Sequence, residues 1–189
     1  MIRKKFFLVF IFPLLFISSC KEENYPKPKG YLKLEYPKSN YTKAKINCPY
    51  TFEIPKQTKI WSNKKCWVKI NYPKLNATID ITYLPVENNI KQLFIEAEKL
   101  TTKHSIKADK ISFIPYVDKK NHVYGKMSNV TGNAASPLQF HVTDSTKHFL
   151  TGAVYFNVQP NYDSILPAIH YIEKDIVHLI ETLRWKNLK

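Results

Sequence analysis

The chain has 189 residues, of which 44% are hydrophobic and 14% aromatic, so it can form one domain of ordinary size with a packed core. Its four glycines are scattered, which excludes the glycine-rich loops that hold nucleotides, and three cysteines are too few for a disulfide-dense miniprotein. Lys and Arg number 29 against 15 Asp and Glu, an excess that favours anionic partners or a solvated basic surface.

The first twenty residues are typical of a signal peptide. Arg3, Lys4 and Lys5 form a basic start, and residues 6–17 carry no charge. At 1.5 Å per residue this apolar run spans about 18 Å, which is short of a hydrocarbon core of about 30 Å. A cleaved signal peptide is therefore favoured over the alternative, a permanent N-terminal anchor helix.

The end of this apolar run has the form of a bacterial lipobox. Ile17 is followed by Ser18, Ser19 and Cys20, which is an aliphatic residue, two small residues and a cysteine. Small side chains admit the peptidase, and a thiol is the group to which diacylglycerol is attached. The alternative is an incidental cysteine in an ordinary signal peptide. We predict a signal peptide over residues 1–19 and lipidation at Cys20, which attaches the protein to a membrane.

A polar segment with two prolines covers residues 20–30 and is interpreted as a tether between the lipid and a single globular domain over residues 31–189. In the first part of that domain, apolar and polar side chains alternate, which predicts antiparallel strands. These strands cover residues 50–54, 66–72 and 77–83. Residues 73–76 provide a connection of hairpin length between the last two.

The period then changes to that of an amphipathic helix, predicted over residues 89–103. Alternation returns in strands over residues 110–117, 122–130, 138–143 and 150–156. A second helix follows, with seven apolar residues on one face between Ile165 and Leu183. Asp163 or Ser164 is expected to be its N-cap.

This order of strands, helix, strands and helix predicts the α+β class, with an antiparallel sheet covered by two main helices on one face or on both. The order is similar to that of the PsbP-like sandwich. Cys48 and Cys66 each stand near the start of a predicted strand, and in an exported domain we expect them to form a disulfide. Two buried free thiols are the alternative.

No catalytic or metal-binding signature emerges from the sequence. None of the six histidines stands at ligand spacing with cysteines or carboxylates. The most polar cluster contains Asp144, Ser145 and His148, the residue types of a hydrolase. A nucleophilic serine needs a base within reach and an oxyanion hole, which three residues of one turn rarely provide. We interpret the cluster as a turn and predict no catalytic residue, no cofactor and no metal.

Positive charge is concentrated in residues 20–75, which hold 13 Lys and 4 acidic residues. Export argues against a nucleic-acid partner. So does the presence of only two Arg in the chain, because Arg is the residue that best recognises phosphates and base edges. A lysine-rich solvated surface and contact with anionic lipid headgroups or an acidic partner both stay open.

Several stretches of the chain are specific enough to be compared with a known family. They are Pro26–Tyr31, Cys48–Tyr50, Cys66-Trp67, residues 132–140, residues 143–149 and residues 153–157. Together they resemble the gliding motility lipoprotein GldD family of Bacteroidetes over nearly the whole mature chain. The resemblance implies a membrane lipoprotein that is required for surface gliding and works beside the type IX secretion machinery. It implies no catalytic residue, and Cys20 alone carries over, as the lipidation site.

We therefore expect a non-enzymatic accessory of the gliding and type IX secretion apparatus that binds or stabilises another envelope component. The lipid would hold it in the cell envelope, at the outer membrane and facing the periplasm. Its expected partners are other gliding motility or type IX secretion proteins and the membrane. The expected contact residues are Asn133, Gln139, Asp144, Ser145, His148 and Asn161. The alternative is an envelope enzyme or a glycan-binding module that acts on cell-wall or surface polysaccharide.

Overall fold

The computed structural model describes residues 36–104, 108–158 and 161–186. The predicted signal peptide, the lipidation site Cys20 and the predicted tether lie outside these residues. Within the described ranges, no helix is both long enough and apolar enough to cross a membrane.

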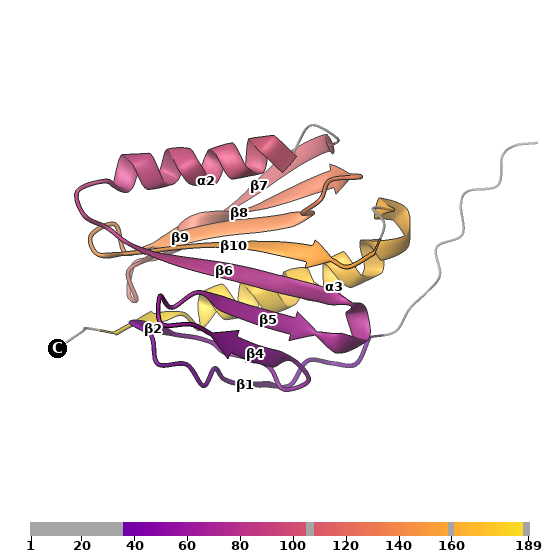
Figure 1. Cartoon of the computed structure of the whole chain (residues 1–189), viewed down its shortest axis with the longest axis horizontal. Coiled ribbons are helices and arrows are strands. Elements are labelled where there is room, and N and C mark those ends of the chain that lie inside the picture. Colours follow the sequence, from indigo (N-terminus) through magenta and orange to yellow (C-terminus); the bar gives the residue numbers. More distant parts are fainter. Residues whose placement is uncertain (1–35, 105–107, 159–160, 187–189) are drawn as a thin grey trace, which may run out of the picture. The chain divides into compact units, whose positions relative to one another are not determined.

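Seven strands form one sheet in which every neighbouring pair is antiparallel (Figure 1). The strands are β4 (Lys59–Ser62), β5 (Val68–Tyr72), β6 (Ala77–Pro85), β7 (Ala108–Asp118), β8 (Val123–Gly132), β9 (Leu138–Thr143) and β10 (His148–Phe156). Their order across the sheet is β4-β5-β6-β10-β9-β8-β7. β10 pairs with β6 from His148 opposite Pro85 to Phe156 opposite Ala77, so this pairing joins strands β4–β6 to strands β7–β10 within the large sheet.

The connection between β5 and β6 is the predicted hairpin. A 3-10 turn, η2 (Pro73–Leu75), leaves β5, and Asn76 follows it in the left-handed region with φ 49°. Asparagine adopts this conformation more readily than most residues with a β-carbon. The hairpin also holds a neighbouring segment, because the side chain of Asn76 donates a hydrogen bond to the carbonyl oxygen of Asn157 at 3.0 Å.

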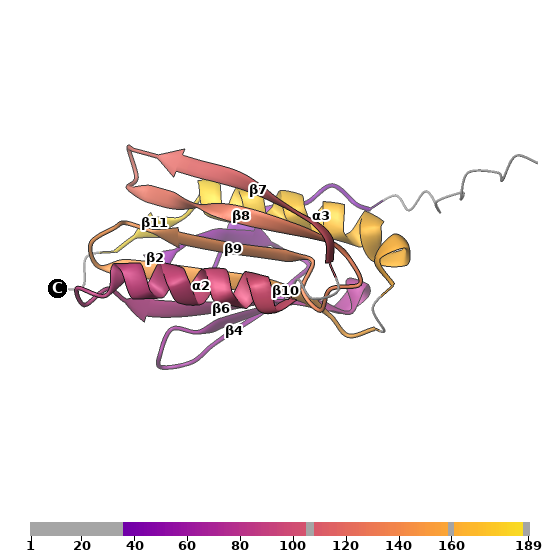
Figure 2. The same ribbon diagram turned by 90° about the horizontal axis from the view of Figure 1, so that it is seen from above.

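Two helices, α2 (Ile90–His104) and α3 (Tyr162–Glu181), lie on opposite faces of the sheet (Figure 2). The α+β class, with an antiparallel sheet and two helices, is therefore confirmed. The closer likeness to the PsbP-like sandwich stays a prediction.

Alternation along β10 explains how one strand serves both faces. Phe149 packs with Leu93 of α2, whereas Leu150 and Val154 belong to the core to which α3 contributes Ile172. Successive side chains of a strand point to opposite faces, so a sheet covered on both sides buries consecutive residues.

Four short strands form two small sheets beside the large one. β1 (Tyr41–Lys43) pairs with β3 (Glu53–Pro55), and β2 (Tyr50–Thr51) pairs with β11 (Arg184–Trp185). The strand predicted over residues 50–54 is thus divided at Phe52 between two sheets. A disulfide joins Cys48 to Cys66 and fixes the start of this region against the loop before β5.

The expected N-cap of the second helix is wrong. Neither Asp163 nor Ser164 caps α3, because the helix begins at Tyr162 and Asn161 is its cap. The Asn161 side chain accepts a hydrogen bond from the backbone N–H of Ser164 at 3.4 Å. Asp163 stands in the first turn, where its charge favours the positive end of the helix dipole.

Candidate functional site

The polar turn between β9 and β10 is built around one carboxylate. Asp144 accepts hydrogen bonds from the backbone N–H groups of Thr146 at 2.9 Å and of Lys147 and His148 at 2.8 Å. Burial acts to raise the pKa of Asp144, but these N–H donors outweigh it and lower the pKa. The carboxylate is therefore held as the anion by its own turn, which agrees with the interpretation of this cluster as a turn.

The ring of His148 contacts two aromatic residues. Its Nδ1 lies 3.0 Å from the Tyr83 hydroxyl, and the ring stacks on Trp185 with centroids 5.1 Å apart. His148 is only 5% exposed, and burial lowers its pKa. Nε1 of Trp185 donates to the carbonyl oxygen of His122 at 2.9 Å, so β6, β10, β11 and the β7–β8 turn meet here.

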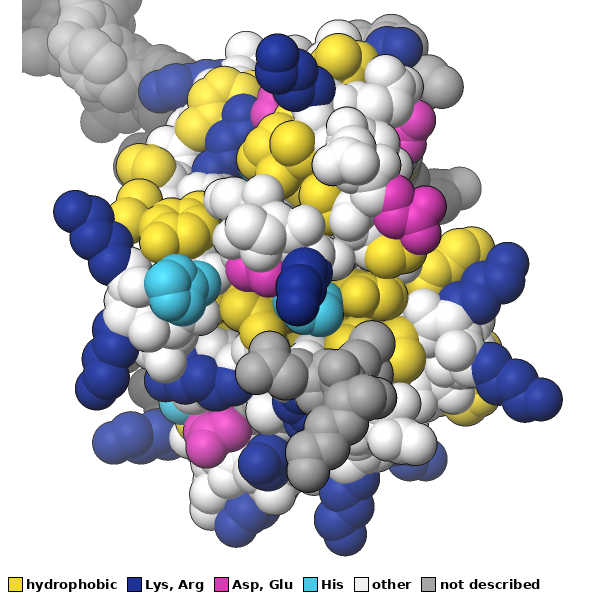
Figure 3. Space-filling view, turned by 90° about the vertical axis from the view of Figure 1, so that its left-hand side faces the viewer, with side chains coloured by type: hydrophobic (Ala, Val, Ile, Leu, Met, Phe, Trp, Pro, Cys, Tyr) yellow, Lys and Arg dark blue, Asp and Glu magenta, His cyan; other side chains and the backbone are white. Residues whose placement is uncertain are grey.

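A basic cavity of about 470 Å³ opens between these elements. We name this surface the basic end and define it by Lys120, Lys147, His148, Arg184 and Trp185, all of which line the cavity. Figure 3 shows the corresponding side of the molecule, with Lys and Arg side chains projecting around its margin and few Asp or Glu side chains. Lys120, Lys147 and Arg184 line the cavity together with one carboxylate, that of Asp144, so the cations outnumber the anion and the surface carries a net positive charge.

The six predicted contact residues do not form one surface. Asp144, Ser145 and His148 lie at the basic end, whereas Asn133 and Asn161 lie near the start of α3, where the Asn133 side chain accepts from the Tyr162 backbone N–H at 3.1 Å. β9 has six residues and runs from the β8–β9 loop that holds Asn133 to the turn at Asp144. At about 3.4 Å per residue it separates the two groups by about 20 Å.

The prediction that Gln139 is a surface contact is wrong. Gln139 is 3% exposed, and its side-chain oxygen accepts a hydrogen bond from the Thr101 hydroxyl of α2 at 2.9 Å. Its position in β9 faces α2, which covers that face of the sheet. The predicted contact is therefore a buried link between the helix and the sheet.

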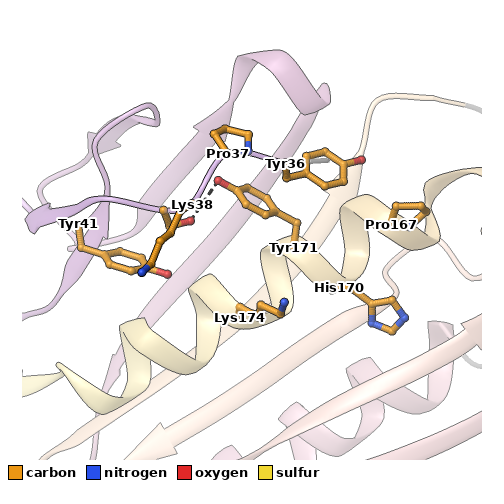
Figure 4. A pocket seen from close by; sticks show the side chains of 9 residues that line it. Tyr36, Pro37, Lys38, Tyr41, Pro167, His170, Tyr171 and Lys174 are labelled. Carbon is orange, nitrogen blue, oxygen red and sulfur yellow. Dashed lines mark hydrogen bonds between the residues drawn. The ribbon is translucent and has the colours of Figure 1, made fainter. Parts of the chain in front are cut away.

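A second cavity, of about 500 Å³, lies where the chain enters the domain, and sequence reasoning missed it. Figure 4 shows Tyr36 from the entering segment lying over Tyr171 of α3, with ring centroids 4.9 Å apart. The hydroxyl oxygens of Ser39 and Tyr171 lie 3.1 Å apart, within hydrogen-bond distance. Lys38 and Lys174 also line the cavity, so its wall combines aromatic faces with ammonium groups.

A buried carboxylate beneath this cavity holds the entering segment to α3. Asp175 is 2% exposed and accepts hydrogen bonds from the hydroxyls of Ser39 at 2.7 Å, Tyr41 at 2.8 Å and Tyr72 at 3.2 Å. Burial raises the pKa of Asp175, although the three hydroxyls oppose the shift. One signal for it was present in the sequence: Asp175 interrupts the apolar face predicted for the second helix, between Ile172 and Ile176.

Replacement of Asp175 by Ala should lower the free energy of unfolding by about 2 kcal/mol, because it leaves buried hydroxyl donors without an acceptor. Urea unfolding measures the change. The matched control is Lys174→Ala, one residue earlier on the exposed face of α3, with an expected change below about 0.5 kcal/mol. Equal effects of the two substitutions would contradict a role of Asp175 in holding the entering segment.

Within the described ranges, no group of three or more His, Cys, Asp or Glu side chains is arranged to hold a metal ion. A model of the family described as gliding motility lipoprotein GldD matches residues 21–185. A comparison with curated proteins gave no match. The matched residues include those that line the basic end and the second cavity.

Proposed function

The chain belongs to the gliding motility lipoprotein GldD family, and from this premise we propose that it is a non-enzymatic accessory of the gliding and type IX secretion apparatus. In this proposal the lipid on Cys20 holds it at the outer membrane, facing the periplasm. Its domain binds an acidic surface of another envelope component through the basic end. The observation that carries the proposal is the set of three cations, Lys120, Lys147 and Arg184, around the stacked Trp185 and His148 rings.

The basic end has the properties of a binding surface rather than those of a lysine-rich surface that is merely solvated. Stacking of His148 on Trp185 and the hydrogen bond from Trp185 to His122 fix its centre. Lys120 and Lys147 are exposed at its margin, where complementary charge speeds association and selects the partner. A rigid centre with a charged margin is the usual anatomy of a specific interface.

An in-frame deletion of the gene tests the proposal, with colony spreading and secretion of type IX cargo measured in parallel. Loss of both places the protein in the secretion machine or in its assembly, whereas loss of spreading alone places it with the motor or the adhesins. Complementation with Cys20→Ala should fail, because the protein then lacks its anchor. If the deletion changed neither spreading nor secretion, the proposed function would be wrong.

The surface is tested by complementation with the double variant Lys120→Glu/Lys147→Glu. We expect it to accumulate and unfold like the wild type but to restore little spreading, because it repels an acidic partner. The matched control, Lys74→Glu/Lys110→Glu, reverses two exposed lysines at the opposite end of the sheet and should restore spreading. Full function of the first variant would show that the partner binds elsewhere.

The second candidate is a glycan-binding module, and the aromatic wall formed by Tyr36 and Tyr171 favours it, since sugar rings pack on aromatic faces. An envelope enzyme would instead depend on the residues of the turn. Complementation by Tyr171→Ala and by Ser145→Ala separates these ideas. Loss of spreading with Tyr171→Ala alone would favour glycan binding, loss with Ser145→Ala would favour an enzyme, and retention in both supports the accessory role.

A further inference from the structure

A third concave surface lies where the β4–β5 loop meets the end of β6. The cavity measures about 920 Å³, and its wall is mainly apolar, formed by Trp67, Leu84, Tyr83 and the Cys48–Cys66 disulfide. Trp67 is 43% exposed, so its indole is open to solvent rather than packed in the core. A cavity of this volume accommodates a small organic ligand.

The loop that carries Trp67 is fixed before any ligand binds. The Asn63 side-chain oxygen accepts from the backbone N–H groups of Lys65 at 2.9 Å and Trp67 at 3.0 Å. The Tyr50 hydroxyl donates to the carbonyl oxygen of Cys66 at 2.6 Å. Cys66 has φ 58°, a left-handed conformation that a residue with a β-carbon keeps only when its surroundings hold it. The disulfide and these hydrogen bonds supply that constraint.

The margin of the cavity is cationic. Lys64, Lys65 and Lys186 line it and are exposed, and Nζ of Lys65 lies 5.4 Å from the centre of the Trp67 ring. The backbone N–H of Lys186 donates to the carbonyl oxygen of Pro49 at 2.7 Å, which fixes the third lysine at the edge. Among the described residues that line this cavity, none carries a carboxylate. The cavity therefore attracts an anion and offers it an apolar neighbour.

We propose that this cavity binds one anionic phospholipid, with the phosphate among the three lysines and the glycerol and first acyl carbons against Trp67 and Leu84. An ammonium group neutralises a phosphate without demanding a particular fork geometry, and lysines near a membrane attract anionic headgroups. Tryptophan is suited to the boundary between headgroups and hydrocarbon. An apolar wall directly beside the cations fits a molecule that carries both charge and hydrocarbon, whereas an acidic peptide or a free phosphate would use the cations alone.

The test titrates the purified full-length lipoprotein, in a neutral detergent, with dihexanoyl phosphatidylglycerol while tryptophan fluorescence is recorded. We expect a saturable change that disappears in Trp67→Phe. The affinity should exceed that for dihexanoyl phosphatidylcholine at least about tenfold and should fall as salt is added, because the phosphate is bound by charge.

Variants locate the site. Lys65→Glu/Lys186→Glu, which reverses one charge on each side of the cavity, should weaken binding of the anionic lipid at least about tenfold. Lys74→Glu, at the far end of the β5–β6 hairpin, should bind like the wild type. Thermal unfolding without lipid checks that each variant keeps its fold, and the comparison of the two lipids on the wild type needs no variant.

Four outcomes would overturn the proposal. Equal affinity for the two lipids would show that the site does not distinguish an anionic headgroup from a zwitterionic one. Equal weakening by Lys74→Glu would show that binding depends only on the overall charge of the protein. If inorganic phosphate bound as tightly as the lipid, the cavity would be an anion site to which the apolar wall adds no affinity. An acidic hexapeptide that binds in place of the lipid would assign the cavity to a protein partner instead.

Discussion

Gly125→Ala should lower the free energy of unfolding by at least about 3 kcal/mol, a loss that puts the folded state of a marginally stable domain at risk. Gly125 lies inside the sheet, opposite Tyr116 of β7 and Val142 of β9. A β-carbon there would overlap the carbonyl oxygen of His141 and stand 2.9 Å from the Cα of Val142. Because both neighbours are backbone, relief requires the β8–β9 pairing itself to move.

Gly152→Ala is the matched comparison, because its β-carbon would overlap only the ring of Phe140. Urea unfolding of the single variants and of Gly152→Ala/Phe140→Leu should show a favourable coupling of about 0.5 kcal/mol or more, since the smaller side chain makes room. No side-chain replacement can relieve Gly125→Ala in this way. A Gly125→Ala protein that unfolds at the wild-type urea concentration would contradict the described strand pairing.

Acid should weaken the domain through His141, whose ring lies between Phe94 and Phe149. Burial, assisted by Lys126 and opposed by Glu98, lowers the pKa of His141 from 6.5 to about 4. Between pH 6.5 and pH 4 the His141 side chain is protonated in the unfolded chain but stays neutral in the folded chain. The contribution of neutral His141 to the free energy of unfolding is therefore fully present above pH 6.5 and is lost as the pH falls toward 4. The loss amounts to about 3 kcal/mol.

The measurement is the free energy of unfolding in urea at pH 7.5, 5 and 4, for the wild type and for His141→Phe. Asp175 acts in the opposite sense, because its raised pKa makes the folded state bind a proton before the unfolded chain does. The difference between the two proteins therefore isolates His141. We expect the variant to lose less stability on acidification, and parallel curves would show that His141 titrates normally in the folded protein.

Elements with a strong local pattern were predictable from the sequence. The helix expected over residues 89–103 is α2, and the turn expected at the cluster of Asp144, Ser145 and His148 is closed by the Asp144 carboxylate. Both depend on neighbours in the chain, which a sequence displays directly. β1, β4 and β11 were missed because they have two to four residues and exist only through pairing with distant segments.

The candidate site was less predictable, for a related reason. Alternation along β9 separates its side chains into two faces, but it does not tell which face a helix covers. Gln139 was therefore placed at the surface, although α2 buries it. The stacking of Trp185 on His148 and the link from Trp185 to His122 join parts of the chain that no local spacing connects. Asp175 was not predicted either, although a carboxylate within an apolar helix face is visible in the sequence.

The pairing of β2 with β11 sets the order in which the domain can be completed. Tyr50 is opposite Trp185, so one of the first strands waits for the last described one. One edge of β6 likewise stays unpaired until β10 has been synthesised, and α2 and three strands lie between them in the chain. Contacts this distant in sequence slow folding, because a long loop must close before its contacts form. In a chain that is synthesised from its N-terminus, the edge of β2 therefore stays unpaired until Arg184 and Trp185 have been made. A chain cut before Arg184 keeps this edge open, which makes it a better substrate for proteases.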